Sequence, residues 1–218
     1  MSILPFTLYT DAGWVSGLVT EAGLAALSLP MPTREEAIRD AAMASFRSSR
    51  IEPATAASAD RKAFTVEGDS SDLSRLRLLA EQVKEWVSRY LKKSESGEPA
   101  CCPVSSPDFP LDLNGMTSFR KAVLLAMANI PYGMVSSYSG LAKAAGYPGC
   151  ARAVGGVCAA NPIPLVIPCH RVILSDGRIG NFGGGKEMKK WLLEREGVAL
   201  ERRADDWIVR ALRFWTFR

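Results

Sequence analysis

Short apolar runs separated by turn residues open the chain, and apolar residues at helical spacing follow them. The runs predict strands, and Asp11–Gly13 predicts the turn between the first two; the strands are expected at 8–10, 14–20 and 23–29. Thr33 and Glu36 form a capping-box pattern, which predicts a helix to about Phe46. Residues 72–93 then repeat apolar side chains at helical period, which predicts a long helix with one buried face.

The middle of the chain is less regular. Residues 48–62 are polar and predict a loop, 64–66 predict a short strand, and 94–99 begin a linker. Residues 109–113 predict a strand that returns to the N-terminal sheet. Cys101 and Cys102 are adjacent, which is not the C-x-x-C spacing of a metal or redox site, so structural or incidental cysteines are expected there.

The C-terminal half predicts mainly helices, at 118–129, 139–145, 150–160 and 186–196. The second and third are joined by a Gly-containing turn, 146–149, which is the pattern of a helix-turn-helix. Small residues dominate the third helix, so it suits close approach to a DNA groove better than the reading of base edges. The last helix is expected to bury Met188, Trp191 and Leu192 and to end at Gly197.

Two connections precede that last helix. Residues 172–179 predict a hairpin that turns at 175–177. Gly180–Gly185 contains four glycines and predicts a flexible loop that can approach a flat ligand. A phosphate-binding loop is excluded because Lys186 is followed by Glu187, not by the Ser or Thr of the Walker pattern.

Charge is unevenly distributed along these 218 residues. Residues 1–116 carry 12 basic and 16 acidic side chains, whereas residues 117–197 carry 10 basic and 4 acidic. A basic half beside an acidic half is expected if only the basic half meets a polyanion, although solvation alone also produces such asymmetry. The chain shows neither an apolar run long enough for a bilayer nor a signal-peptide pattern, and its five cysteines fit a reducing cytoplasm.

The most distinctive stretch is Asn161–Val172. Its three prolines predict a stiff, extended segment, since proline fixes φ and donates no hydrogen bond. The segment ends at Cys169, followed by His170, the only histidine in the chain. A thiol is a good nucleophile only as thiolate, and a neighbouring base raises the thiolate fraction. Without further context, a buried cysteine and a satisfied core histidine would explain the pair equally well.

The neighbourhood removes that ambiguity, because Pro168–Val172 reads Pro-Cys-His-Arg-Val. This run resembles the active-site loop of the O6-alkylguanine-DNA alkyltransferases, the methylated-DNA–protein-cysteine methyltransferases. The resemblance runs from about Phe119 to Gly197 and includes Arg152–Gly156, Asn161-Pro162 and Trp191–Gly197. It implies that Cys169 is the nucleophile, that His170 takes its proton through a water, and that Glu196 orients the imidazole. Asn161 is expected to brace the turn by side-chain to backbone hydrogen bonds.

The same resemblance implies the DNA-binding residues. Arg152 corresponds to an arginine that fills the gap left by an extruded base, and Tyr138 to a tyrosine that crowds the phosphate and donates a proton to the purine. Close approach to DNA falls to small residues of the same helix: Ala151, Gly155 and Gly156. The expected substrate pocket consists of Tyr138, Pro164, Val172, Phe182 and Gly183. Phe182 departs from the family, which often has tyrosine there, so any hydrogen bond from that hydroxyl is lost.

The resemblance also implies an α+β fold with an RNase H-like α/β support module at 1–100, a linker and returning strand at 101–116, and a mainly helical domain at 117–197. That domain holds the helix-turn-helix and the active-site cysteine loop. Residues 198–218 extend past the family's core. This aromatic, basic tail could stack on nucleic acid, but packing against the domain surface is expected.

The function implied is DNA repair by direct reversal: one irreversible transfer of the alkyl group of O6-alkylguanine, or less readily O4-alkylthymine, to Cys169 after nucleotide flipping. No cofactor and no metal are expected. The implied partner is double-stranded DNA, bound through its minor groove largely without regard to sequence. A cytoplasmic monomer that does not contact membranes is expected.

Three other functions were weighed against this one. A lesion-binding protein without chemistry would lack the nucleophile that Cys169 supplies. A cysteine hydrolase would need a histidine distant in sequence from its cysteine. A transcription factor would need a recognition helix richer in hydrogen-bonding side chains, and its binding would be sequence-specific.

Overall fold

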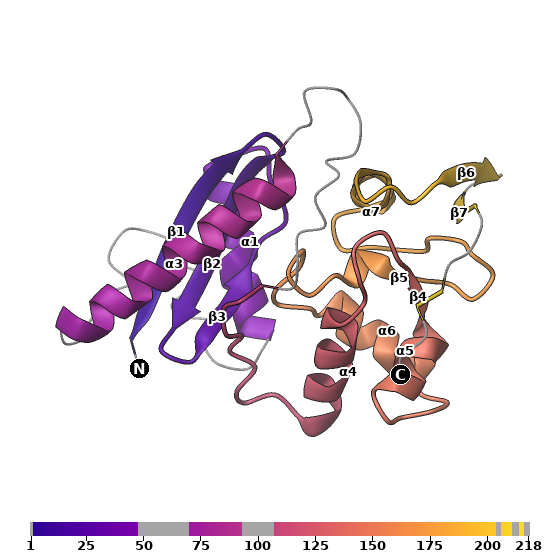
Figure 1. Cartoon of the computed structure of the whole chain (residues 1–218), viewed down its shortest axis with the longest axis horizontal. Helices are drawn as coiled ribbons and strands as arrows, with labels where there is room; N and C mark the ends of the chain where they lie inside the picture. The colour runs from indigo at the N-terminus through magenta and orange to yellow at the C-terminus, as the bar shows by residue number, and fades with distance from the viewer. Residues whose placement is uncertain (1, 48–69, 93–106, 204–205, 211–213, 216–218) are drawn as a thin grey trace. The chain divides into compact units, whose positions relative to one another are not determined.

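The computed structural model describes residues 2–47, 70–92, 107–203, 206–210 and 214–215 (Figure 1). The described residues group into two compact units. The first contains those up to residue 92 together with 107–116 and 162–164, and the second contains 117–161 and those from 165 onward. Helices and sheets occur in both, so the predicted α+β class is confirmed. Predictions at 48–62, 64–66, 94–99 and Cys101-Cys102 lie outside the described residues.

The first unit is built on an antiparallel sheet of three strands in the order β1-β2-β3. The strands are β1 (Ile3–Thr10), β2 (Gly13–Thr20) and β3 (Gly23–Leu27), so the first begins five residues earlier than predicted. Residues 15–20 of β2 are buried without alternation, which indicates that both faces of this central strand are covered.

Two helices pack against this sheet, α1 (Arg34–Arg47) and α3 (Ser70–Leu91). The capping box forms as predicted: the Glu36 N–H donates to Thr33 Oγ1, and the Thr33 N–H donates to Glu36 Oε2, both at 3.2 Å. The α3 side chains that the helical period predicted to be inward include those buried at Leu76, Val83 and Val87.

The predicted returning strand is present in reduced form. Leu111 pairs with Leu24 of β3 as a single parallel bridge, in which the Leu24 N–H donates to the Pro110 carbonyl and the Asp112 N–H to the Leu24 carbonyl, both at 2.9 Å. The Leu27 N–H, at the end of the same strand, donates to the Pro162 carbonyl at 2.9 Å, which explains why 162–164 group with this unit.

The second unit contains the predicted helices almost residue for residue: α4 (Ser118–Ala128), α5 (Tyr138–Ala144) and α6 (Ala151–Ala159). Thr117 caps α4 and Ser137 caps α5, each by a side-chain oxygen that accepts a backbone N–H. The turn between α5 and α6 passes through Gly146 and Gly149, both with positive φ, which completes the helix-turn-helix.

Only the turn of the predicted hairpin at 172–179 forms, closed by a hydrogen bond from the Leu174 N–H to the Arg178 carbonyl at 2.9 Å. Strand β5 (Val172–Ile173) pairs in parallel with β4 (Ser136–Ser137), and not with residues 178–179. Arg178 instead bridges Ile208 in the C-terminal hairpin, which consists of β6 (Leu200–Arg203) and β7 (Asp206–Val209). The pairing could not be read locally because Ser136 of β4 lies 36 residues before Val172, and Ile208 of β7 lies 30 residues after Arg178.

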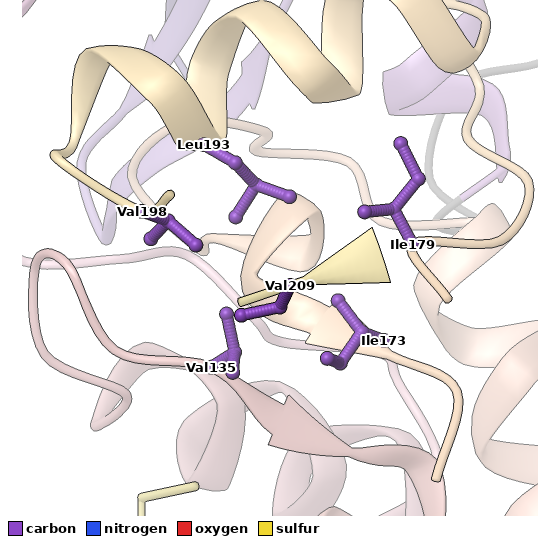
Figure 2. Packing of buried hydrophobic residues seen from close by; sticks show 6 residues of the cluster. All are labelled: Val135, Ile173, Ile179, Leu193, Val198 and Val209. Atoms are coloured by element: carbon purple, nitrogen blue, oxygen red, sulfur yellow. The ribbon is translucent and has the colours of Figure 1, made fainter. Parts of the chain in front are cut away.

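These strands enclose a core with α7 (Lys186–Arg195). Six buried side chains point toward one another there, as Figure 2 shows: Val135, Ile173, Ile179, Leu193, Val198 and Val209. Leu200, Trp207 and Phe214 pack against this cluster. The described residues after 197 therefore help to form the core of the second unit.

None of the helices in the described part of the chain is long and apolar enough to cross a membrane.

Candidate active site

The segment that leads to Cys169 is a series of turns, so the predicted extended conformation is wrong. Residues 161–170 are all buried. Leu165 has φ of 71°, the one positive value for a non-glycine residue among those described. This left-handed conformation costs roughly 1–2 kcal/mol, so the surrounding packing must hold it in place. The prolines thus restrict a compact bend that delivers the cysteine into the interior.

Cys169 begins a single 3-10 turn, Cys169–Arg171, and only 7% of its surface is exposed. Asn161 Nδ2 donates to the Ile167 carbonyl at 2.7 Å, which braces the bend as expected, and Asn161 also hydrogen-bonds the Cys169 thiol. Burial raises the pKa of Cys169, against the hydrogen bond from Asn161 and the charge of Lys189. The resting sulfur is therefore a thiol, and it needs a base.

His170 is fully buried and contacts Glu196, with Nε2 2.8 Å from Oε1. Burial lowers the pKa of His170, despite the raising influence of Glu196. Burial alone would raise the pKa of Glu196, but His170 and Arg171 outweigh it and hold the pKa far below its usual range. An ionised carboxylate only accepts hydrogen bonds, so Nε2 carries the proton and Nδ1 is the basic nitrogen of a neutral ring.

Arg171 supplies the charge that balances Glu196. Its Nε donates to Oε2 at 2.8 Å and its Nη2 to Oε1 at 2.9 Å, and its Nη1 donates to the Ile130 carbonyl at 2.5 Å. Because this bidentate pair neutralises the carboxylate, the imidazole does not have to be protonated. The sequence analysis assigned no role to Arg171; its place directly after His170 was the available signal.

The end of α7 places Glu196. Glu196 is the C-cap residue, and Gly197 follows with φ of 77° while the Val198 N–H donates to the Leu193 carbonyl at 3.0 Å. The turn after α4 meets this helix end, since the Gly133 N–H donates to Glu196 Oε2 at 3.2 Å. A Cβ on Gly133 would lie 2.9 Å from the Glu196 carbonyl oxygen, so only glycine allows this approach.

Lys189 is a second residue that the sequence analysis missed. It is fully buried, and its Nζ donates to the Val172 carbonyl at 2.7 Å. No carboxylate pairs with it within the described ranges. Burial lowers the pKa of Lys189 to about 8, against the attraction of Cys169 and Cys158. Its ammonium group is thus a buried positive charge in the electrostatic environment of the nucleophile.

The predicted inward face of α7 needs correction for this reason. Leu192 is buried as expected, but Trp191 is 36% exposed and Met188 is half-buried. The buried face is Lys189, Leu192, Leu193 and Glu196, which follow the three-, four- and seven-residue spacing of one helix side. If the buried side of α7 had been assigned from the position of Glu196 and not from the largest apolar side chains, Lys189 would have been predicted to be buried.

An open cavity of about 460 Å³ lies between the helix-turn-helix and the residues that follow β5. Its lining residues are Tyr138, Ser139, Ala151, Arg152, Gly155, Leu174, Ser175 and Asn181. A Cβ on Gly155 would be 3.9 Å from Tyr138 Cε1, so the small residue leaves the tyrosine ring room. Burial raises the pKa of Tyr138 to about 12, which keeps its hydroxyl a hydrogen-bond donor.

The structure gathers only part of the predicted pocket in this cavity. Tyr138, Ala151, Arg152 and Gly155 line it, and Arg152 is exposed. Gly156, Val172, Phe182 and Gly183 are not among its lining residues. Val172 is buried in β5, Phe182 is half-buried in the glycine loop, and Pro164 is buried and groups with the first unit. Asn181, Leu174 and Ser175 line the cavity without having been predicted.

Fold and site together define an α+β protein whose second unit combines a helix-turn-helix with a buried Cys–His–Glu cluster. A family model described as the DNA-binding domain of 6-O-methylguanine DNA methyltransferase matches residues 118–198. Residues 118–198 of this chain are therefore similar to that domain.

Two curated relatives are both named methylated-DNA–protein-cysteine methyltransferase. The one from Methanothermobacter thermautotrophicus is 47% identical over 100 residues, 46% of this chain and 56% of the relative. The one from Rattus norvegicus is 42% identical over 120 residues, 54% of this chain and 55% of the relative. The chain thus spans little more than half the length of these curated relatives.

A solved structure resembles more of the chain. The O6-methylguanine methyltransferase of Mycobacterium tuberculosis is 28% identical, with a TM-score of 0.54 over 89% of this chain and 92% of that protein. A crystal structure of that protein in complex with DNA is 26% identical, with a TM-score of 0.54 over 88% and 91% of the two chains.

Proposed function

We propose that this protein repairs DNA by transferring the alkyl group of O6-alkylguanine to Cys169. The observation that carries the proposal is the buried cluster in which His170 is neutral while Glu196 and Arg171 balance each other's charge. A neutral imidazole can accept a proton, and His170 directly follows Cys169, whose thiol is protonated at rest. A thiol next to such a base can be converted to the thiolate that the reaction requires. The family match over 118–198 supports the same chemistry.

The reaction balances without another reagent. The Cys169 proton passes to His170 Nδ1, through a water, and the thiolate sulfur attacks the alkyl carbon. A carbon–sulfur bond forms as the bond from carbon to O6 breaks, and the electron pair leaves with the guanine. The Tyr138 hydroxyl supplies a proton to the purine, which makes guanine a better leaving group. The tyrosinate that results regains its proton from the imidazolium of His170, and the raised pKa of Tyr138 favours this return. The product is a thioether, which ordinary hydrolysis does not reverse, so each molecule acts once and needs no cofactor.

Double-stranded DNA is the proposed partner. Access to an O6 atom within a stacked duplex requires the nucleotide to be flipped out, at a cost of a few kcal/mol. Arg152 is exposed on α6 at the rim of the 460 Å³ cavity, where it would enter the gap left by the base. Small residues of α6 allow close approach to a minor groove without base readout. The DNA complex of the M. tuberculosis relative supports DNA as the partner.

Stoichiometric transfer tests the proposal. The protein is mixed with a duplex that carries one O6-methylguanine, and its peptides are then weighed. We expect one methyl group per protein, on the peptide that contains Cys169, and no gain in Cys169→Ser. A mass gain on Cys150 or Cys158 instead would contradict the assignment, and binding without any gain would indicate lesion recognition without chemistry.

A further inference from the structure

The C-terminal hairpin, β6 and β7, contacts both ends of the glycine loop 180–185. At the start of the loop, the Ile179 N–H donates to the Trp207 carbonyl at 2.9 Å, and Arg178 bridges Ile208. The Val209 N–H donates to the Gly177 carbonyl at 3.0 Å. Residues 207–209 of β7 therefore pair with residues 177–179, which directly precede the loop.

The other end of the loop is fastened by side chains of the same strand. Lys186, the first residue of α7, forms an ion pair with Asp206 at 3.3 Å. Trp207 Nε1 donates to Glu187 Oε1 at 3.5 Å, and Lys190 Nζ lies 4.7 Å from the centroid of the Trp207 ring. The backbone of Trp207 thus contacts the residues before the loop, and its ring contacts α7, which follows the loop.

The hairpin itself is anchored in the core. Val209 at the end of β7 and Val198 just before β6 pack with Ile173 and Ile179, as Figure 2 shows. Ile173 follows the nucleophile segment in β5, and Ile179 precedes the loop. Trp207 packs against the same cluster. A displacement of its ring would therefore be passed to residues on both sides of the loop.

The loop has little structure of its own. Four of its six residues are glycine, and the one described backbone hydrogen bond between two of them runs from the Gly185 N–H to the Phe182 carbonyl at 3.0 Å. Glycine-rich segments have a large conformational entropy, so the positions of the two ends decide which shapes the loop can take. Asn181 lines the 460 Å³ cavity that contains part of the predicted substrate pocket, so the loop shape affects the shape of that cavity.

We propose that Trp207 is a positioning residue that holds the glycine loop in the shape required for alkyl transfer and thereby sets which alkyl groups are accepted. The inference rests on the proposed function. It assigns a role in the reaction to the segment after Gly197, which lies outside the residues that carry the chemistry.

The test compares single-turnover transfer from duplexes that carry O6-methylguanine or O6-benzylguanine. We expect Trp207→Ala to slow methyl transfer roughly tenfold, because small misplacements of binding groups cost this much or more. We also expect it to change the ratio of benzyl to methyl rates at least threefold. Trp207→Phe keeps a ring over Lys190 and against the core, so it should restore both rates to within about twofold of wild type.

Trp191→Ala is the matched control. Trp191 lies on the exposed side of α7, where the Arg195 guanidinium lies 5.5 Å from the centroid of its ring. This variant should keep both rates and their ratio. Asp206→Asn removes the ion pair with Lys186 but leaves the core side chains in place. It therefore tests the attachment of the hairpin to the start of α7 even if Trp207→Ala does not fold. We expect it to change the benzyl-to-methyl ratio in the same direction.

An unchanged ratio in both Trp207→Ala and Asp206→Asn would overturn the inference, even if both rates fell equally, because equal losses indicate a stability effect alone. A change of the same size in Trp191→Ala would also overturn it. Failure of the proposed function would be seen separately, as wild-type protein that transfers neither alkyl group.

Discussion

The carboxylate of Glu196 accepts hydrogen bonds from His170, Arg171 and the Gly133 N–H. Such a group has two roles, since it orients the base and keeps a buried guanidinium paired. Substitution of Glu196 by glutamine removes the negative charge and keeps the shape of the side chain. Its effects on stability and on transfer should then appear together.

We expect Glu196→Gln to lower the free energy of unfolding by about 3–5 kcal/mol, because it leaves Arg171 buried without its counter-charge. Transfer should slow by roughly 10²-fold or more, the usual contribution of a general base. Urea unfolding and single-turnover rates measure the two effects. Glu194→Gln is the control, because Glu194 is 42% exposed and pairs only with Lys190 at the surface, where loss costs at most about 1 kcal/mol.

The same variant has a pH signature. The folded-state pKa of Glu196 is depressed below its ordinary value of 4.5, so its stabilising contribution is present above that pH and declines as pH falls below it. The stability difference between wild type and Glu196→Gln should therefore shrink on acidification. A difference that grows toward low pH would contradict the ion pair.

The burial of Lys189 was not predicted from the sequence and is seen only in the structure. Its folded-state pKa of about 8 lies below the ordinary 10.5, so the unfolded chain binds the proton more tightly. Wild type should gain stability relative to Lys189→Met as pH rises from about 8 to 10.5, by about 3 kcal/mol in total. Urea unfolding of both proteins across this range measures it, and Lys190→Met, which removes a half-buried lysine paired to Glu194, is the control.

At the scale of elements, the helices were predictable and the pairings were not. The apolar spacing of 118–129 and the capping box at Thr33 are local signals, and both helices form within a residue or two of the prediction. Strands β4 and β5 are two residues each, too short to carry a pattern. Their pairing depends on residues 36 positions apart, as in Ser136 and Val172, which no local window contains.

The turn from Ile130 to Gly133 connects two elements that the sequence separates widely. It ends α4, and Gly133 meets the end of α7. Gly133→Ala would introduce a left-handed alanine and a Cβ 2.9 Å from the Glu196 carbonyl oxygen. Gly146→Ala is a fair comparison, since Gly146 has a similar φ of 84° but nothing within 4 Å of its Cβ position.

We expect Gly146→Ala to cost roughly 1 kcal/mol of unfolding free energy, the usual penalty of the left-handed conformation. Gly133→Ala should cost at least about 1 kcal/mol more and should slow alkyl transfer, since Glu196 must shift. Denaturant unfolding and transfer rates test this together. Equal costs in the two variants would mean that the contact with Glu196 is not close enough to matter.

At the scale of the molecule, the uneven charge is a property of the whole C-terminal half. Residues 117–197 have a net charge of +6, whereas residues 1–116 have −4. Many weak contacts of basic residues with phosphate would supply most of the affinity for DNA, and these do not distinguish damaged from normal bases. Arg152 should act differently, because its proposed place is in the base stack and not on the phosphates.

Arg152→Ala should therefore slow transfer from duplex DNA roughly tenfold or more, since flipping costs a few kcal/mol. Transfer from free O6-benzylguanine, which needs no flipping, should stay within about twofold of wild type. Parallel rates with the two substrates measure this. Equal slowing with both would place Arg152 in the chemical step, and no slowing with either would make it a surface residue.

The site residues that could be predicted are those that stand together in one short, distinctive stretch of sequence. Cys169, His170 and Asn161 stand in one proline-framed run, so their type and order indicated the chemistry directly. Arg171 and Lys189 gave no such signal, because a lysine or arginine in sequence normally indicates a solvated side chain. Their burial arises from tertiary contacts, of Arg171 with the Ile130 carbonyl and of Lys189 with the Val172 carbonyl, which exist only in the folded chain.

The hydrogen bonds of Glu196 also bear on molecules that are not fully folded. The carboxylate reaches His170 only when the last turn of α7 is formed and the Gly133 turn is seated against it. If either element opens, the imidazole loses its orientation, and Cys169 becomes an ordinary thiol of low reactivity at neutral pH. Under the proposed mechanism, activation of Cys169 therefore requires both elements to be formed, and a partly opened chain would react slowly with the electrophiles around it.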